Sequence, residues 1–227
     1  HKYNYSDLPL WDKLFGTYQK ELKEVPPVYG ITRPVRTWNP IKINFSHLWL
    51  MMKDAWRTNS WKDKFTLWFK PTGYRPDDVI KKYPVYKIED VYQFEKYDTR
   101  TSILLNVWCW VQLVMTLVFV SYFFGNIALI NNLDKTFIFW YGGFIFLTIY
   151  AMTDLMDRNP YAIVWESFRS GLGLYFLYQQ NDWFGASAWL WWISYSLIAY
   201  FIVSTAVTGW LVYKHYIEDT RQLFISL

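Results

Sequence analysis

One stretch limits the possible folds more than any other. Residues Ile103 to Phe124 contain no charged side chain. At a rise of about 1.5 Å per residue, a helix of this length crosses a hydrocarbon core of roughly 30 Å. The stretch therefore predicts a transmembrane helix in an all-α integral membrane protein.

Three further apolar runs follow, at Thr136 to about Met152, Tyr161 to Tyr178, and Ser187 to about Tyr213. The first contains Gly142-Gly143, where small residues allow close helix approach. We expect a helical bundle of about four spans, preceded by amphipathic interfacial helices and loops. If Tyr161 to Tyr178 lies in the membrane interface instead, three spans remain.

Two ionisable residues, Glu166 and Arg169, interrupt the run from Tyr161 to Tyr178. At i, i+3 spacing they can face one another, which lowers the cost of placing either charge in lipid. An ionisable pair inside a membrane is by default a candidate functional site. A structural clasp is the alternative interpretation, which the match of acid with base favours.

The composition separates two unlike halves. Hydrophobic residues make up 53% of the chain and aromatic residues 22%, and Trp and Tyr are enriched at membrane interfaces. Residues 1–100 hold 18 Lys and Arg against 12 Asp and Glu, whereas residues 101–227 hold 5 against 7. This asymmetry predicts a basic, cytoplasmic N-terminal half in a bacterial inner membrane or endoplasmic reticulum. No basic block or nucleic-acid-binding module is present, so we expect no nucleic-acid partner.

We expect the first part, residues 1–100, to lie on the cytoplasmic side of the membrane or in its interface. An amphipathic helix is predicted from Asn44 to about Thr58, and Ser60 with Asp63 resembles a capping box that opens a second one. Residues 101–227 form the transmembrane domain.

Adjacent acids at Asp77 and Asp78 are expected to cap a helix that begins near Val79, and they are assigned no catalytic role. Two arginines, Arg33 and Arg36, lie in a loop punctuated by Gly and Pro. They are either a basic rim for lipid headgroups or residues of a solvated loop.

An aromatic helical turn is predicted near the start of the chain. Trp11, Leu14, Phe15 and Tyr18 share one helical face, and Gly16 suits a left-handed stop. The run Leu10-Trp11-Asp12-Lys13-Leu14-Phe15-Gly16-Thr17-Tyr18 resembles a W-D-x-L-F-G-T signature. The motifs that follow it are Val28-Tyr29-Gly30-Ile31-Thr32-Arg33-Pro34, Thr37-Trp38-Asn39-Pro40, Trp61-Lys62-Asp63-Lys64 and Gly73-Tyr74-Arg75-Pro76. In this order they resemble the membrane-bound fatty acid hydroxylase and sterol desaturase superfamily, in the branch that includes alkylglycerol monooxygenase.

The resemblance implies a pair of iron ions held by eight or more histidines in characteristic boxes. The chain has three histidines, His1, His47 and His215, and none lies in such a box. The single cysteine, Cys109, excludes a cysteine-based metal site within the chain. We therefore assign no catalytic or metal-ligating residue here and expect an upstream portion, or another subunit, to carry the histidines.

By resemblance, the chain is the C-terminal part of a di-iron, O₂-dependent membrane lipid hydroxylase or desaturase. Residues 1–100 would then be the cytoplasmic or interfacial end of its sterol-desaturase-like catalytic domain. Trp11, Asp12 and Phe15 would then support the iron ligands or line the substrate channel. The alternative is a non-catalytic membrane subunit that binds a partner protein or lipid. The substrate and the electron donor stay open.

Overall fold

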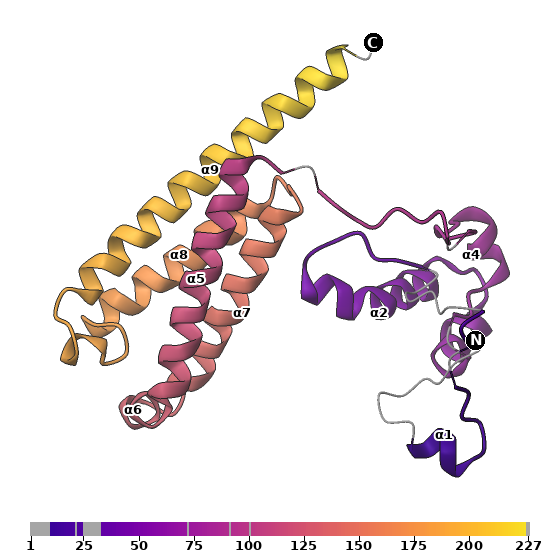
Figure 1. Cartoon of the computed structure of the whole chain (residues 1–227), viewed down its shortest axis with the longest axis horizontal. Helices are drawn as coiled ribbons and strands as arrows, with labels where there is room; N and C mark the ends of the chain where they lie inside the picture. Colours follow the sequence, from indigo (N-terminus) through magenta and orange to yellow (C-terminus); the bar gives the residue numbers. More distant parts are fainter. Residues whose placement is uncertain are drawn as a thin grey trace. The chain divides into compact units, whose positions relative to one another are not determined.

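The computed structural model describes residues 10–20, 22–24, 33–71, 73–90, 92–99 and 101–225, with side chains as far as Glu218 (Figure 1). His1 and residues 28–32 of the second motif therefore lie outside the described residues. The chain divides into two compact units, His1–Val35 with Lys53–Lys96, and Arg36–Met52 with Tyr97–Leu227. The second unit thus joins a pre-membrane segment to the apolar half.

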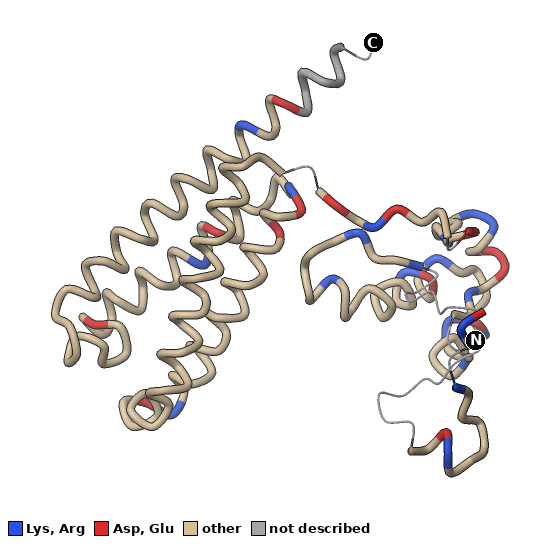
Figure 2. The backbone as a smooth tube through the Cα atoms, viewed as in Figure 1, with Lys and Arg blue, Asp and Glu red and all other residues tan. Residues whose placement is uncertain are grey.

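Regular structure in the described ranges is helical, without strands. In chain order the elements are α1 (Leu10–Leu14), α2 (Pro40–Arg57), α3 (Trp61–Thr66), the 3₁₀ turn η1 (Leu67–Phe69), α4 (Asp77–Lys82), α5 (Ile103–Gly125), α6 (Ile127–Leu133), α7 (Phe137–Met156), α8 (Ala162–Gln180), η2 (Ala186–Ala188) and α9 (Ile193–Ile225). Charged residues are sparse along α5, α7, α8 and α9 and frequent in the other unit (Figure 2).

These four long helices form a bundle (Figure 1). Helix α7 packs on α5 and α8, and α8 packs on α9. Among the described residues, three helical segments are long and apolar enough to cross a membrane: Ile103–Gly125, Phe137–Met156 and Ile193–Glu218. The all-α membrane bundle is confirmed. The remaining expected span, Tyr161 to Tyr178, corresponds to α8. This bundle helix is less apolar, and its crossing of the membrane stays a prediction.

The bundle core is a cluster of aromatic rings contributed by every long helix and by the loop after α8. Its largest buried members are Phe119, Tyr141, Phe144, Phe176, Trp183, Phe184 and Phe201. The loop residues Trp183 and Phe184 are 2% and 0% exposed, and the Trp183 indole donates a hydrogen bond to the Tyr141 hydroxyl at 3.1 Å. The loop therefore folds back into the bundle.

Close helix approach occurs at Gly173, and the prediction for Gly142-Gly143 was wrong. A Cβ added at either Gly142 or Gly143 would meet no atom within 4 Å. At Gly173 it would lie 2.4 Å from the Phe201 ring, which is fully buried. The missing side chain at Gly173 is what lets α9 pack against α8.

The other unit is held by side-chain contacts between its short elements. The Arg75 guanidinium donates to both carboxylate oxygens of buried Asp54, at 2.8 Å for Nη2 to Oδ1, and also to the Tyr83 carbonyl at 3.0 Å. This places the arginine of the Gly73–Pro76 motif in a structural ion pair between the end of α2 and the segment before α4.

Of the two expected helix caps in this unit, the cap at Ser60 is confirmed, whereas α4 begins at Asp77 after Pro76 and has no side-chain cap. The Asp63 amide donates to Ser60 Oγ at 3.2 Å, which begins α3. The Asp78 carboxylate lies in the first turn of α4 and accepts from the amides of Asn59 and Val79, both at 2.9 Å. Accordingly, hydrogen bonding by the Asn59 amide lowers the pKa of Asp78.

Alanine substitutions at two glycines of α8 should separate the effect of packing on stability from the effect of helix propensity. We expect Gly173→Ala to lower the free energy of unfolding by about 1–3 kcal/mol, because the added methyl must displace a buried ring. The control Gly171→Ala, two residues away in α8 where nothing lies within 4 Å, should be neutral or stabilising. Denaturation in detergent micelles measures both variants, and equal stability of the two would contradict the packing role.

Candidate functional site

The Thr37-Trp38-Asn39-Pro40 motif begins α2 and attaches it to the membrane unit. Asn39 caps the helix, since its Oδ1 accepts from the amides of Ile41 and Lys42 at 3.0 and 3.3 Å. Pro40 occupies the first helical position, where its missing N–H leaves no bond unmade. The helix therefore starts at Pro40, four residues before the predicted Asn44.

A single carboxylate, that of Asp157 just after α7, holds the motif in place. It accepts hydrogen bonds from the Thr37 hydroxyl and from the Trp38 amide, the latter at 2.8 Å. The Trp38 amide bonds to Asp157 Oδ1, and the Tyr97 hydroxyl donates to the same atom at 3.0 Å. Segments on both sides of residues 53–96 thus meet at one side chain.

A second anchor lies one turn earlier in α7. The carboxylate of Asp154 is fully buried and forms an ion pair with the Lys42 ammonium. Burial lowers the pKa of Lys42, but the hydrogen bond and the negative charge of Asp154 outweigh it and raise the pKa overall. Asp154 Oδ2 has no hydrogen-bond partner in the described part of the chain.

A groove of about 370 Å³ adjoins these anchors. It is lined by Trp38, Asp98, Thr99, Thr101, Asn106, Cys109, Trp110, Leu113, Met152 and Met156. The Trp38 indole is fixed beside it, because Nε1 donates to Thr99 Oγ1 at 3.1 Å and the Thr99 hydroxyl donates to the Met156 carbonyl at 3.0 Å. The groove walls come mainly from α5 and α7, and most of them are apolar.

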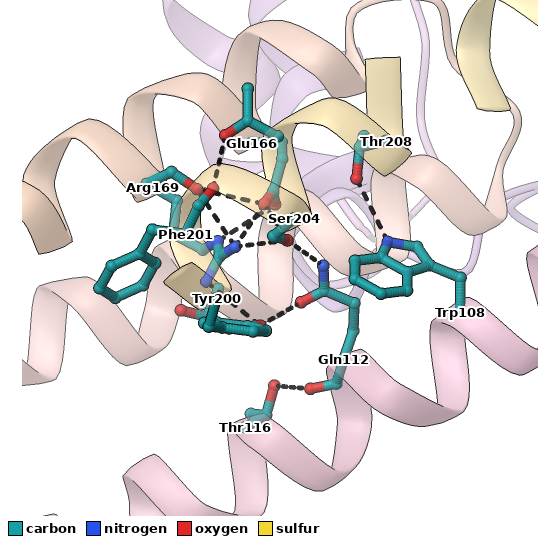
Figure 3. A network of polar contacts seen from close by, with 12 residues as sticks. Trp108, Gln112, Thr116, Glu166, Arg169, Tyr200, Phe201, Ser204 and Thr208 are labelled. Atoms are coloured by element: carbon teal, nitrogen blue, oxygen red, sulfur yellow. Dashed lines mark hydrogen bonds and ion pairs between the residues drawn. The ribbon is translucent and has the colours of Figure 1, made fainter. Parts of the chain in front are cut away.

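A buried polar network joins three helices deeper in the bundle (Figure 3). Arg169 and Glu166 of α8 form a doubly hydrogen-bonded ion pair, with Nε to Oε2 at 3.1 Å, and are 0% and 3% exposed. Arg169 Nη2 also donates to Ser204 Oγ of α9 at 2.9 Å. The positive and negative charges are therefore neutralised within the protein.

Helix α5 completes the network. Gln112 Nε2 donates to Ser204 Oγ at 2.6 Å, and the Tyr200 hydroxyl donates to Gln112 Oε1 at 2.7 Å. The Arg169 guanidinium also lies over the Tyr200 ring, 5.3 Å from its centroid. The ionisable groups are thus enclosed by protein partners, which favours the structural clasp; that role stays a prediction.

The N-terminal candidates Trp11, Asp12 and Phe15 lie on and just after α1. The Trp11 and Phe15 rings stack at 6.4 Å and are 60% and 73% exposed. The Thr17 hydroxyl donates to Asp12 Oδ1 at 3.1 Å, and Gly16 has the expected positive φ of 69°. Within the described residues this aromatic face is open to a partner.

The other residues singled out in the sequence are two arginines and two histidines. Arg33 and Arg36 belong to different compact units. His47 is exposed on α2, whereas His215 is buried in α9.

No group of three or more His, Cys, Asp or Glu side chains in the described ranges could hold a metal ion. The described residues therefore do not fit the iron pair that the resemblance implies.

The anchors Lys42, Asp154 and Asp157 are not apparent from the sequence. Asp154 and Asp157 are two acids at i, i+3 that close an apolar run, a pattern that by itself indicates only a turn. Their partners are distant in sequence, since Lys42 and Asp154 are 112 positions apart. Only the three-dimensional fold identifies such pairs.

Removing one member of the Glu166–Arg169 pair should lower the stability of the protein more than removing both charges. Arg169→Met leaves the Glu166 carboxylate buried and unpaired, and we expect a loss of about 3–5 kcal/mol in stability. The double variant Glu166→Gln/Arg169→Met should recover part of that loss. Denaturation in micelles tests this, and a single variant at least as stable as the double one would contradict it.

Tyr97 should ionise unusually late. Burial and its hydrogen bond to Asp157 raise the pKa of Tyr97 to about 12 from an ordinary value of about 10. Since the folded-state pKa is raised, its stabilising contribution is complete below pH of about 10 and lost as the pH rises to about 12. The difference between ultraviolet titrations of the natural protein and Tyr97→Phe should show one tyrosinate forming near pH 12. A tyrosinate near pH 10 would contradict the contact.

Comparison with curated proteins shows similarity to alkylglycerol monooxygenases. The human protein is 30% identical over 166 residues, which is 71% of this chain and 35% of the human protein. The Xenopus tropicalis protein is 26% identical over 220 residues, or 95% of this chain and 46% of the frog protein. The Caenorhabditis elegans protein is 40% identical over 40 residues, 18% of this chain and 8% of the worm protein.

No family model and no solved structure matches the chain. The chain spans about a third to a half of the length of the human and frog relatives that it matches. It is thus a helical membrane protein similar to a part of the alkylglycerol monooxygenases.

Proposed function

We propose that this chain forms the C-terminal, membrane-embedded part of a monooxygenase that acts on alkylglycerols. The observation that carries the proposal is the frog alignment, which covers 95% of the chain and so includes both the N-terminal motifs and the membrane bundle. The four-helix bundle supports it, because an enzyme that acts on lipids works at or within the bilayer.

Monooxygenation of an unactivated C–H bond requires a group that activates O₂, which ordinary side chains do not do. In this proposal a pair of iron ions supplies that chemistry and is held by histidines from a segment outside this chain. The chain spans only 35–46% of its human and frog relatives, which leaves a long segment for that role.

The residues of this chain would act as support. The exposed rings of Trp11 and Phe15 are available to pack against the catalytic portion, and Asp12 could hydrogen-bond a metal-bound imidazole. Arg33 and Arg36 would meet lipid headgroups at a cytoplasmic interface. The Glu166–Arg169 pair would hold the bundle together.

The function is tested with the full-length natural protein in nanodiscs, supplied with iron, a reductant and isotopically labelled O₂. Mass spectrometry should find one labelled oxygen atom in the product from 1-O-hexadecylglycerol. The matched ester, monopalmitoylglycerol, and a sterol serve as comparison substrates. An iron-loaded protein that oxidises none of them would overturn the proposal, and a protein that binds no iron would favour a non-catalytic membrane subunit.

A substitution tests the supporting role of Asp12. We expect Asp12→Ala to lower iron affinity or turnover by about tenfold, as the loss of hydrogen bonds around metal ligands commonly does. Asp134→Ala is the matched control, because Asp134 also accepts a hydrogen bond from a nearby threonine, Thr136 at 2.7 Å, in a loop of the membrane unit. Equal effects of the two substitutions would remove the special role of Asp12.

A further inference from the structure

The groove beside Trp38 combines an apolar wall with membrane-spanning helices. Cys109 and Leu113 lie one turn apart on α5, and Met152 and Met156 lie one turn apart on α7. All four side chains are partly buried. Its volume of about 370 Å³ lies in the usual range of roughly 300–1,000 Å³ for small-molecule sites. The wall is suited to an aliphatic chain.

The remainder of the lining is polar, with free hydrogen-bonding capacity. Asp98, Thr101 and Asn106 line it, and none of these side chains forms a hydrogen bond or ion pair with another described residue. Thr99, by contrast, is occupied on both sides by Trp38 and Met156. A ligand that reaches this part of the groove would find a carboxylate, a hydroxyl and a carboxamide.

The charge of the lining selects among lipid headgroups. Among the described lining residues, Asp98 carries the one charged side chain, and it is negative. A phosphate head would be repelled by this carboxylate. A head with free hydroxyl groups can donate to Asp98 and both donate to and accept from Asn106.

We propose that this groove binds a single-chain, uncharged lipid with a hydroxylated head, with hydroxyls on Asp98 and Asn106 and the chain between α5 and α7. The assignment of an alkylglycerol as the ligand rests on the proposed function. The assignment of the groove as a lipid-binding site rests on its lining alone. One wall of the groove is Trp38, which belongs to the motif at the start of α2. Hydrogen bonds to Asp157 and Thr99 hold it in place.

The test measures binding without turnover. The full-length natural protein in phosphatidylcholine nanodiscs is irradiated with 1-O-hexadecylglycerol carrying a diazirine in the chain, and labelled peptides are mapped by mass spectrometry. Saturable labelling should concentrate on α5 and α7 around Cys109, Leu113 and Met152. Labelling that does not saturate and spreads equally over the exposed faces of α5, α7 and α9 would overturn the proposal.

Two substitutions test the polar contacts. We expect Asn106→Leu and Asp98→Ala each to raise the probe concentration for half-saturation by about threefold to tenfold, the effect of losing one hydrogen bond. Both residues are exposed, so the fold should tolerate the changes. The matched control Asn131→Leu, at an exposed amide of α6, should leave labelling unchanged. Equal effects at positions 106 and 131 would contradict the assignment.

Competition identifies the head. Unlabelled 1-O-hexadecylglycerol should displace the probe at a concentration at least tenfold lower than its phosphorylated counterpart, which has the same chain. Stronger competition by the phosphorylated lipid would overturn the headgroup assignment. Because no oxygen chemistry is involved, specific labelling without turnover would refute the proposed function alone, and turnover without specific labelling would refute the groove alone.

Discussion

The buried Glu166–Arg169 pair is the interaction on which the membrane bundle depends. An isolated charge in a low-dielectric interior is very costly, so each member must keep its partner. The pair also fixes its neighbours, since Ser204 of α9 bonds to Arg169 and Gln112 of α5 bonds to Ser204. A slide of α5 or α9 along α8 would break these bonds. The polar network thus sets the relative heights of the helices, and the aromatic core then packs in the register that results.

Local features of the fold could be predicted from the sequence. The apolar run after Ile103, the cap at Ser60 and the left-handed Gly16 depend on residues within a few positions of one another. The contact of Glu166 with Arg169 has the same origin, since i, i+3 spacing in a helix brings two side chains together. Each is determined by helix geometry, which needs no knowledge of tertiary structure.

Features that depend on tertiary packing could not be predicted. Gly142-Gly143 is a pair of small residues of the kind found where helices approach closely, but no other side chain packs there. Gly173 is a site of close approach because the Phe201 ring faces it. Trp183 follows a polar stretch, yet it is buried because its loop turns inward. The groove combines a motif near residue 38 with two membrane helices, so its lining exists only in the folded chain.

Asp157 receives the Trp38 amide from one segment and the Tyr97 hydroxyl from another. Residues 53–96 therefore form an insertion between two segments of the membrane unit that both bind this one side chain. The entropy lost in closing a flexible loop grows slowly with length, by about 0.6 kcal/mol for each doubling. Evolution could lengthen, shorten or exchange this insertion at little cost to the bundle, as long as the Asp157 carboxylate and its donors at Thr37, Trp38 and Tyr97 are retained.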